Sequence, residues 1–129
     1  MDDDRNRAAR EVFEDHLRQG KHGSVEEDFA RNYSEDVVLL TGRGVYRGRK
    51  GLQRLAQMLA EELPGADFEY RTKLVEGEMA FLEWKAHSKD ARVDDGADSF
   101  CIRDGRIVSQ TIHYTVEPLS EQRKAGGQQ

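Results

Sequence analysis

One acidic residue of this sequence lies where a charge is difficult to accommodate. Strand-like alternation places Asp98 on the same side of the chain as Phe100 and Ile102. A carboxyl group that points into apolar surroundings must be paired, hydrogen-bonded or protonated, because an unpaired buried charge is costly. Asp98 is therefore a candidate catalytic acid or base in a pocket, and the alternative is a structural carboxylate bound by a nearby Tyr, Trp or backbone donor.

Histidine and tyrosine supply the other candidates for chemistry. His16 lies at the edge of the apolar stripe of a helix, from which it could reach a pocket as a general base; a half-buried structural histidine is the alternative. Tyr33 and Tyr46 could each donate a hydroxyl hydrogen bond to a ligand, or else pack at the ends of their elements. His113 alternates with Tyr114 and is expected on the outward face of a strand, as an interface residue.

Metal sites and other catalytic motifs are not indicated. The 4 histidines have no metal-ligand spacing, and the single cysteine, Cys101, has no partner for a disulfide or a zinc site. The sequence contains no Ser-His-Asp order, glycine-rich phosphate loop or dinucleotide fingerprint. We therefore expect no cofactor and no metal, and neither a nucleophilic hydrolase nor a dinucleotide-binding enzyme.

Three helices are predicted in the N-terminal half. Apolar residues at helical spacing indicate a first helix that ends at Gly20, and Ser24 with Glu27 forms a capping box that opens a second. The longest helical stripe follows later and ends before Pro64. The predicted elements are helices over about 6–20, 24–33 and 50–63, a buried strand over 36–41 and a short strand at 45–46.

A sheet with one buried face is predicted in the C-terminal half. Apolar side chains alternate there with charged ones, as in Phe68, Tyr70 and Leu74 against Glu69 and Lys73. Asp-Gly at 104–105 is a favoured hairpin turn. The predicted strands cover about 68–74, 79–88, 97–103 and 107–116, with a loop or bulge around 94–96.

Length and composition bound the class of protein. The 129 residues suffice for a single domain with one core, and 36% hydrophobic with 35% charged residues is typical of a soluble globular protein. No apolar run approaches the roughly 20 residues of a membrane span, and the start lacks a signal-like segment, so we expect a cytoplasmic protein that does not bind membranes. The net charge of -5 argues against nucleic acid as a partner, because it repels phosphate.

Helices interleaved with two short strands and followed by an antiparallel meander are typical of an α+β fold. Three stretches in this order carry a family resemblance: 32–39 (NYSEDVVL), 46–52 (YRGRKGL) and 98–107 (DSFCIRDGRI). With the element order, they resemble the SnoaL-like branch of the nuclear transport factor 2-like superfamily. Its members include polyketide cyclases, ketosteroid isomerases, scytalone dehydratase and limonene epoxide hydrolase.

The resemblance implies a cone-shaped fold, in which three N-terminal helices with short strands pack on a curved antiparallel sheet around a pocket. It covers a SnoaL-like domain over 6–118, and the composition of the two ends predicts an acidic disordered start over 1–5 and a polar flexible tail over 119–129. Each residue of the implied pocket lining also has core packing as its alternative. The lining set is Phe13, Leu40, Phe68, Tyr70, Trp84, Phe100 and Tyr114.

The resemblance also bears on chemistry. Asp98 falls on the position of the aspartate that, in ketosteroid isomerases, stays protonated and donates a hydrogen bond to the substrate oxyanion; an apolar site can keep such a carboxyl neutral. Where those isomerases have a tyrosine in the first helix this chain has Phe13, and where they have the aspartate base it has Thr41. Ketosteroid isomerisation is therefore not expected.

Two functions remain for a pocket that takes a small hydrophobic molecule. The first is a cofactor-free acid–base enzyme for cyclisation, isomerisation or dehydration, with Asp98 as acid or base and His16 or a tyrosine assisting. The second is a non-catalytic ligand-binding domain, and a dimeric or protein-binding interaction domain is the third alternative. Because relatives pair through the outward sheet face, which here carries Thr111 and His113, we expect a homodimer.

Overall fold

The computed structural model describes residues 7–119. The predicted acidic start, residue 6 and all of the predicted tail except Leu119 lie outside the described residues. Within 7–119, no helix combines the length and apolar character that a membrane span requires.

Three helices precede most of the sheet: α1 (Ala9–His22), α2 (Val25–Asn32) and α3 (Gly48–Glu62). The apolar stripe of α1 buries Val12, Phe13 and Leu17. The predicted end at Gly20 is wrong, because α1 continues through it to His22. Gly20 serves a close approach instead, since a Cβ there would lie 2.9 Å from the hydroxyl of Tyr70.

The second helix begins where its capping residue predicts. The Oγ of Ser24 accepts a hydrogen bond of 3.1 Å from the backbone N–H of Glu27, which satisfies one of the free donors of the first turn. The helix ends at Asn32, so Tyr33 starts the first strand rather than continuing the helix.

The sheet is mixed and mostly antiparallel. Its strands are β1 (Tyr33–Thr41), β2 (Gly44–Arg47), β3 (Asp67–Glu76), β4 (Met79–His87), β5 (Ala91–Arg103), β6 (Arg106–His113) and the short β7 (Glu117–Pro118). The strands lie in the order β2-β1-β6-β5-β4-β3, and β7 pairs with β5. The pairing of β1 with β6 is parallel, so the purely antiparallel sheet that the sequence suggested is corrected at this one junction.

The segment 94–96 belongs to a strand rather than to a loop. β5 runs without interruption from Ala91 to Arg103, and the irregularity lies in its register with β4, between Trp84 and Ala86. Gly96 pairs with Trp84, and a Cβ at position 96 would lie 2.3 Å from the indole ring. The glycine is therefore needed where the indole lies against the backbone of β5.

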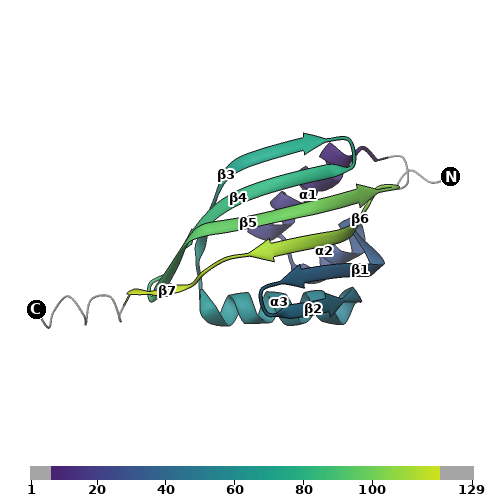
Figure 1. The fold of residues 1–129 in the computed structure, drawn as a ribbon. Coiled ribbons are helices and arrows are strands. Elements are labelled where there is room, and N and C mark those ends of the chain that lie inside the picture. Colours follow the sequence, from purple (N-terminus) through teal and green to yellow (C-terminus); the bar gives the residue numbers. More distant parts are fainter. Residues whose placement is uncertain (1–6, 120–129) are drawn as a thin grey trace, which may run out of the picture.

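The helices and the sheet form two layers (Figure 1). α1 and α2 lie behind the sheet, and α3 runs along the side of β1 and β2. The inner face of the sheet buries Leu39, Leu82, Trp84 and Phe100 against the helices. The outer face has no helix over it among the described residues.

The outer face exposes several apolar side chains. The predicted buried strand alternates in fact, so that Val37 and Leu39 are buried while Leu40 is 47% exposed. Leu40 pairs with Val45 on the neighbouring strand, which is also exposed. The expectation that Leu40 lines a pocket is therefore wrong.

Candidate functional site

A cavity of about 700 Å³ lies between the three helices and the inner face of the sheet. Most of its wall is apolar, and α3 supplies a row of these side chains on the helical face that the sequence pattern indicated. The apolar wall from α3 and the segment after it includes Leu52, Leu55, Leu59, Leu63 and Ala66.

The structure brings most of the predicted site residues together around this cavity. Asp98, His16, Tyr33, Phe68, Tyr70, Trp84 and Tyr114 all line it. They come from α1, from β1, β3, β4 and β5, and from the segment that follows β6. Three of the aromatic side chains form a contiguous group, in which the ring centroid of Trp84 lies 5.6 Å from that of Phe68 and 5.6 Å from that of Tyr114.

Four predicted lining residues lie elsewhere. Phe13 and Phe100 are core residues, packed edge to face with ring centroids 5.4 Å apart, because both point into the contact between α1 and β5. Tyr46 packs against Gly51 at the start of α3, and its hydroxyl lies 3.9 Å from the Sδ of Met58. Leu40 points outward, as described above.

Asp98 lies on the cavity wall with its carboxylate held by two donors. The indole Nε1 of Trp84 donates to Oδ1 at 2.9 Å, and the amide Nε2 of Gln110 donates to Oδ2 at 3.0 Å. The Gln110 amide is oriented in turn by the hydroxyl of Tyr33, which donates to its Oε1 at 2.6 Å. Burial raises the pKa of Asp98 to about 6, although both donors and the charge of His16 act to lower it.

His16 is held by a carboxylate from the next helix. Its Nδ1 lies 2.7 Å from Oδ2 of Asp28, and its ring packs edge to face on Tyr33 and Phe100. Burial acts to lower the pKa of His16, but the charge and hydrogen bond of Asp28, with the charges of Asp98 and Asp15, raise it overall. An imidazole bound through Nδ1 to a carboxylate has its second nitrogen, Nε2, left for a ligand.

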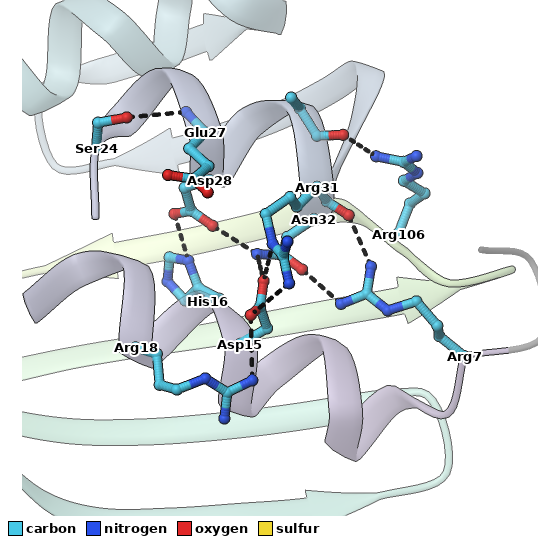
Figure 2. Close-up of polar contacts among 11 residues, drawn as sticks. Arg7, Asp15, His16, Arg18, Ser24, Glu27, Asp28, Arg31, Asn32 and Arg106 are labelled. Atoms are coloured by element: carbon cyan, nitrogen blue, oxygen red, sulfur yellow. Dashed lines mark hydrogen bonds and ion pairs between the residues drawn. The ribbon is translucent and has the colours of Figure 1, made fainter. Parts of the chain in front are cut away.

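A buried polar network lies behind this pair (Figure 2). The amide nitrogen of Asn32 donates to Oδ1 of Asp28 at 2.9 Å and to Oδ2 of Asp15 at 2.8 Å. Arg31 binds Asp15 through Nε and Nη2, at 2.8 and 3.0 Å, and Arg18 binds the same carboxylate at 3.1 Å. These donors hold the pKa of Asp15 well below its usual range.

Sequence reasoning missed Asp15, Asp28 and Asn32 in this network. The signal was their spacing: Asp28 and Asn32 follow Val25 at the same helical intervals as the apolar stripe, so they share its buried face. Gln110 was missed for a related reason. It lies two residues before Ile112 and faces the same side of β6 as that residue, close to Asp98 on the adjacent strand.

A second polar cluster lies on the cavity wall away from Asp98. Arg43 pairs with Glu62 at 2.7 Å, and the hydroxyl of Tyr114 donates to the other carboxylate oxygen of Glu62, also at 2.7 Å. The guanidinium of Arg43 lies 5.4 Å from the centroid of the Tyr114 ring. Burial and the adjacent Glu62 carboxylate raise the pKa of Tyr114.

The predicted interface residue His113 is exposed. The side chain of His113 is 67% exposed and pairs with Asp95 at 3.3 Å, which places it at the rim of the cavity wall. Over residues 7–119, no group of three or more His, Cys, Asp and Glu side chains is arranged to hold a metal ion. The ionisable side chains that line the cavity are those of His16, Asp28, Arg43, Asp98 and His113, together with the tyrosines.

Solved structures share this fold. A proposed ketosteroid isomerase from Kribbella flavida is 21% identical over 83% of this chain and 77% of its own, with a TM-score of 0.69. A proposed polyketide cyclase from Sinorhizobium meliloti is 16% identical over 79% of this chain and 93% of its own, with a TM-score of 0.65. TerC, co-crystallised with polyporic acid, is 16% identical over 83% of this chain and 91% of its own, with a TM-score of 0.66.

At such identities the likeness establishes the fold and leaves activity open. No match to the sequence was found among curated proteins. The family model described as the SnoaL-like domain matches residues 9–110, which is most of the chain. The three helices, the mixed sheet and this match agree, and the chain belongs to the SnoaL-like domain family.

Proposed function

We propose that this SnoaL-like protein binds a small hydrophobic molecule in its cavity and moves a proton on it, with Asp98 and His16 as the acid–base pair. One observation carries the proposal: the carboxyl of Asp98 and the imidazole of His16 line the same cavity from opposite layers of the fold, and the protein raises the pKa of each above its ordinary value. A general acid or base works best when its pKa lies near the working pH. The two hydrogen-bond donors to Asp98, Trp84 and Gln110, do not titrate, so His16 is the partner for proton transfer.

The wall of the cavity supports a hydrophobic ligand with a ring system. Its volume of about 700 Å³ lies in the range of small-molecule sites, and aromatic side chains provide flat surfaces on which rings can stack. Structural neighbours are named for steroid isomerisation and polyketide cyclisation, and TerC was crystallised with polyporic acid. Isomerisation, cyclisation and dehydration share one step, the removal of a proton from a carbon next to a carbonyl or hydroxyl-bearing carbon.

The geometry of the pair assigns the two roles. With Nδ1 of His16 donating to Asp28, the neutral imidazole has a lone pair on Nε2 and can accept a proton from the ligand. Asp98, when protonated, can donate to the ligand oxygen on which negative charge develops. When the two groups hold one titratable proton between them, two states are possible. The proton lies either on Asp98, with His16 neutral and ready to act as the base, or on His16, which gives the His16–Asp98 ion pair. The two groups therefore titrate as a coupled pair.

Proton exchange on a simple ketone tests this proposal. The protein is incubated in D₂O with 2-tetralone or 1-indanone, and the loss of the proton signal next to the carbonyl is followed by ¹H NMR. We expect exchange faster than in buffer, reduced at least about 100-fold in both D98N and H16Q, which is the usual scale of general acid–base catalysis. H87Q, at an exposed histidine on β4, is the matched control and should exchange as the wild type does.

The same samples separate catalysis from binding. Trp84 lies in the cavity wall, so its fluorescence should change when a ketone binds. A fluorescence change without exchange above the buffer rate would point to the non-catalytic ligand-binding alternative. Exchange that persists in both D98N and H16Q would refute the roles assigned to these residues.

We also propose that two copies pair through the outer sheet face. This face exposes Leu40, Val45, Leu74 and Met79, and no helix among residues 7–119 covers it. Register places these residues on the side opposite the buried Leu39 and Leu82, at both edges of one continuous surface. A pairing of this surface with its copy would be isologous and would leave both cavities on the far sides of the interface.

A further inference from the structure

The carboxylate that holds His16 has few partners of its own. Among residues 7–119, the polar contacts of the Asp28 side chain are with Nδ1 of His16 and with the amide of Asn32. Three arginines belong to the same polar network, and all three bind other atoms. Arg18 and Arg31 bind Asp15, and Arg7 binds the backbone carbonyl of Arg31 and the side chain of Asn32.

Asn32 is hydrogen-bonded to Asp28 on one side and to Arg7 on the other, and Figure 2 shows it between these two residues. It is fully buried, and both the nitrogen and the oxygen of its amide are hydrogen-bonded. The nitrogen donates to Asp28 and to Asp15, while the Oδ1 accepts from Nη2 of Arg7 at 2.7 Å. A flipped amide would turn its oxygen toward two carboxylates and its N–H groups toward a guanidinium, so these partners fix its orientation.

We propose that Asn32 is a positioning residue for His16: it holds Asp28 against Nδ1 and separates the Asp28 carboxylate from the arginines that would otherwise bind it. The inference rests on the proposed function in one respect, the use of Nε2 of His16 as the base. A neutral amide is suited to this place, because it satisfies an oxygen of Asp28 without cancelling its charge. The negative charge of Asp28 is thereby kept for the imidazole.

Two properties of His16 depend on this arrangement. A free neutral imidazole carries its proton mainly on Nε2, whereas a carboxylate at Nδ1 selects the form with the proton on Nδ1. Asn32 therefore decides which nitrogen carries the lone pair. The charged and titratable groups that face His16 are Asp28 from α2, Asp15 from α1, Asp98 from β5 and Tyr33 from β1, and removing Asn32 changes the freedom of the first two.

The tautomer can be read directly by NMR of the imidazole nitrogens in the full-length protein. Long-range ¹H–¹⁵N spectra distinguish the two neutral forms from the charged one, and loss of a signal in H16Q assigns His16. In the wild type above the pKa of His16, we expect the Nδ1–H form. In N32A, the arginines gain access to Asp28, so we expect a populated Nε2–H form and a lower His16 pKa. N32S also leaves the space of the amide group unfilled, and its hydroxyl can replace only one of the two hydrogen bonds that Asn32 donates. If N32A fails to fold, we expect the same changes in the His16 tautomer and pKa in N32S.

The control is S24A, which removes the cap of α2 and so destabilises the same helix without touching Asp28 or Asn32. It should leave the His16 tautomer unchanged. A wild-type His16 in the Nε2–H form would overturn the proposal, as would a folded N32A or N32S whose His16 tautomer and pKa match the wild type. A changed tautomer in N32A, with no exchange of either ketone by the wild type, would support the positioning role and refute the proposed function. Ketone exchange that needs His16, with an unchanged tautomer in N32A, would do the reverse.

Discussion

Trp84 and Asp98 lie diagonally across β4 and β5 and are joined by a hydrogen bond of 2.9 Å from the indole Nε1 to the carboxylate Oδ1. The bond places the largest aromatic surface of the cavity beside its buried acid. Any change that moves the indole therefore also removes a hydrogen-bond donor from the Asp98 carboxylate.

The contribution of Asp98 to the unfolding free energy should decrease as the pH rises, because Asp98 is a buried carboxyl with a raised pKa. The folded-state pKa of Asp98 is about 6, against about 3.9 in an unfolded chain. Folding therefore favours the protonated form, and the contribution of this group is fully present below about pH 4 and is lost as the pH rises to 6 and beyond. The total change is roughly 3 kcal/mol for a shift of two pKa units.

Substitution by asparagine isolates this contribution. We expect the unfolding free energy of the wild type, relative to D98N, to decrease between pH 4.5 and 7.5 in urea titrations. A relative wild-type stability that instead increases with pH would mean that the ionised carboxylate is the favoured form, and that Asp98 is structural.

Gly96→Ala should displace the indole of Trp84. The added Cβ would lie 2.3 Å from ring atoms, and no rotation of an alanine can relieve this overlap. We expect a loss of about 1–3 kcal/mol, typical of an overpacked site, and a red-shifted tryptophan emission as the ring gains solvent. Gly42→Ala is the matched control, because nothing lies within 4 Å of its added Cβ. Unchanged emission in G96A would show that the backbone of β5 yields instead.

Asp28→Asn should lower the pKa of His16 and destabilise the protein most on the acid side. The raised His16 pKa means that the stabilisation is present below about pH 6.5 and is lost as the pH rises through the folded-state value. A hydrogen bond to a charged partner contributes roughly 1.5–3 kcal/mol. Thermal unfolding at pH 5.5 and 8.5 checks this, and a loss of equal size at both values would contradict it.

The proposed homodimer can be tested by sedimentation at micromolar concentration. The wild type should sediment with twice the monomer mass, and L40K should shift it toward the monomer, because a charge would be buried in the interface. Q57K adds the same charge on the exposed face of α3 and should remain dimeric. A monomeric wild type, or L40K that pairs as well as Q57K, would rule out this face.

The alternating segments made the buried face of β4 and β5 predictable, but the placement of Leu74 with Phe68 and Tyr70 was wrong. Leu74 is 59% exposed, because the register of β3 with β4 shifts between Tyr70 and Thr72. Ala80, Leu82, Trp84 and Ala86 are all buried on one face of β4, and Asp98 lies on the buried face of β5 as its neighbours indicated. The alternation of β1 could not be predicted, because the four residues from Val37 to Leu40 are all apolar. Such a run does not indicate which side of the strand faces the core. The strand at 94–96 was likewise not predicted, because two exposed aspartates followed by a glycine, Asp94, Asp95 and Gly96, are typical of loops.

The polar part of the site was harder to predict for a different reason. Asp28 and Asn32 lie on the buried face of their helix, but a buried polar side chain needs partners that come from other elements. Asp15 and His16 supply these from α1, and nothing in the local pattern of α2 specifies them. The neighbouring position of β1 and β6 is likewise a tertiary property, because parallel strands leave no hairpin signal.

The parallel pairing of β1 with β6 also has a consequence for the order of folding. It joins segments at opposite ends of the domain, and the hydrogen bond from Tyr33 to Gln110 spans 77 residues. Contacts this distant in sequence require the largest loop closure and form late, whereas the hairpins of β3, β4, β5 and β6 need only local closure. The hairpins can therefore bring Asp98 beside Trp84 and Gln110 early, but Gln110 gains its Tyr33 partner only when the chain closes. The hydrogen-bond chain from Tyr33 through Gln110 to Asp98 should thus be completed in the last step of refolding, together with the closure of the sheet.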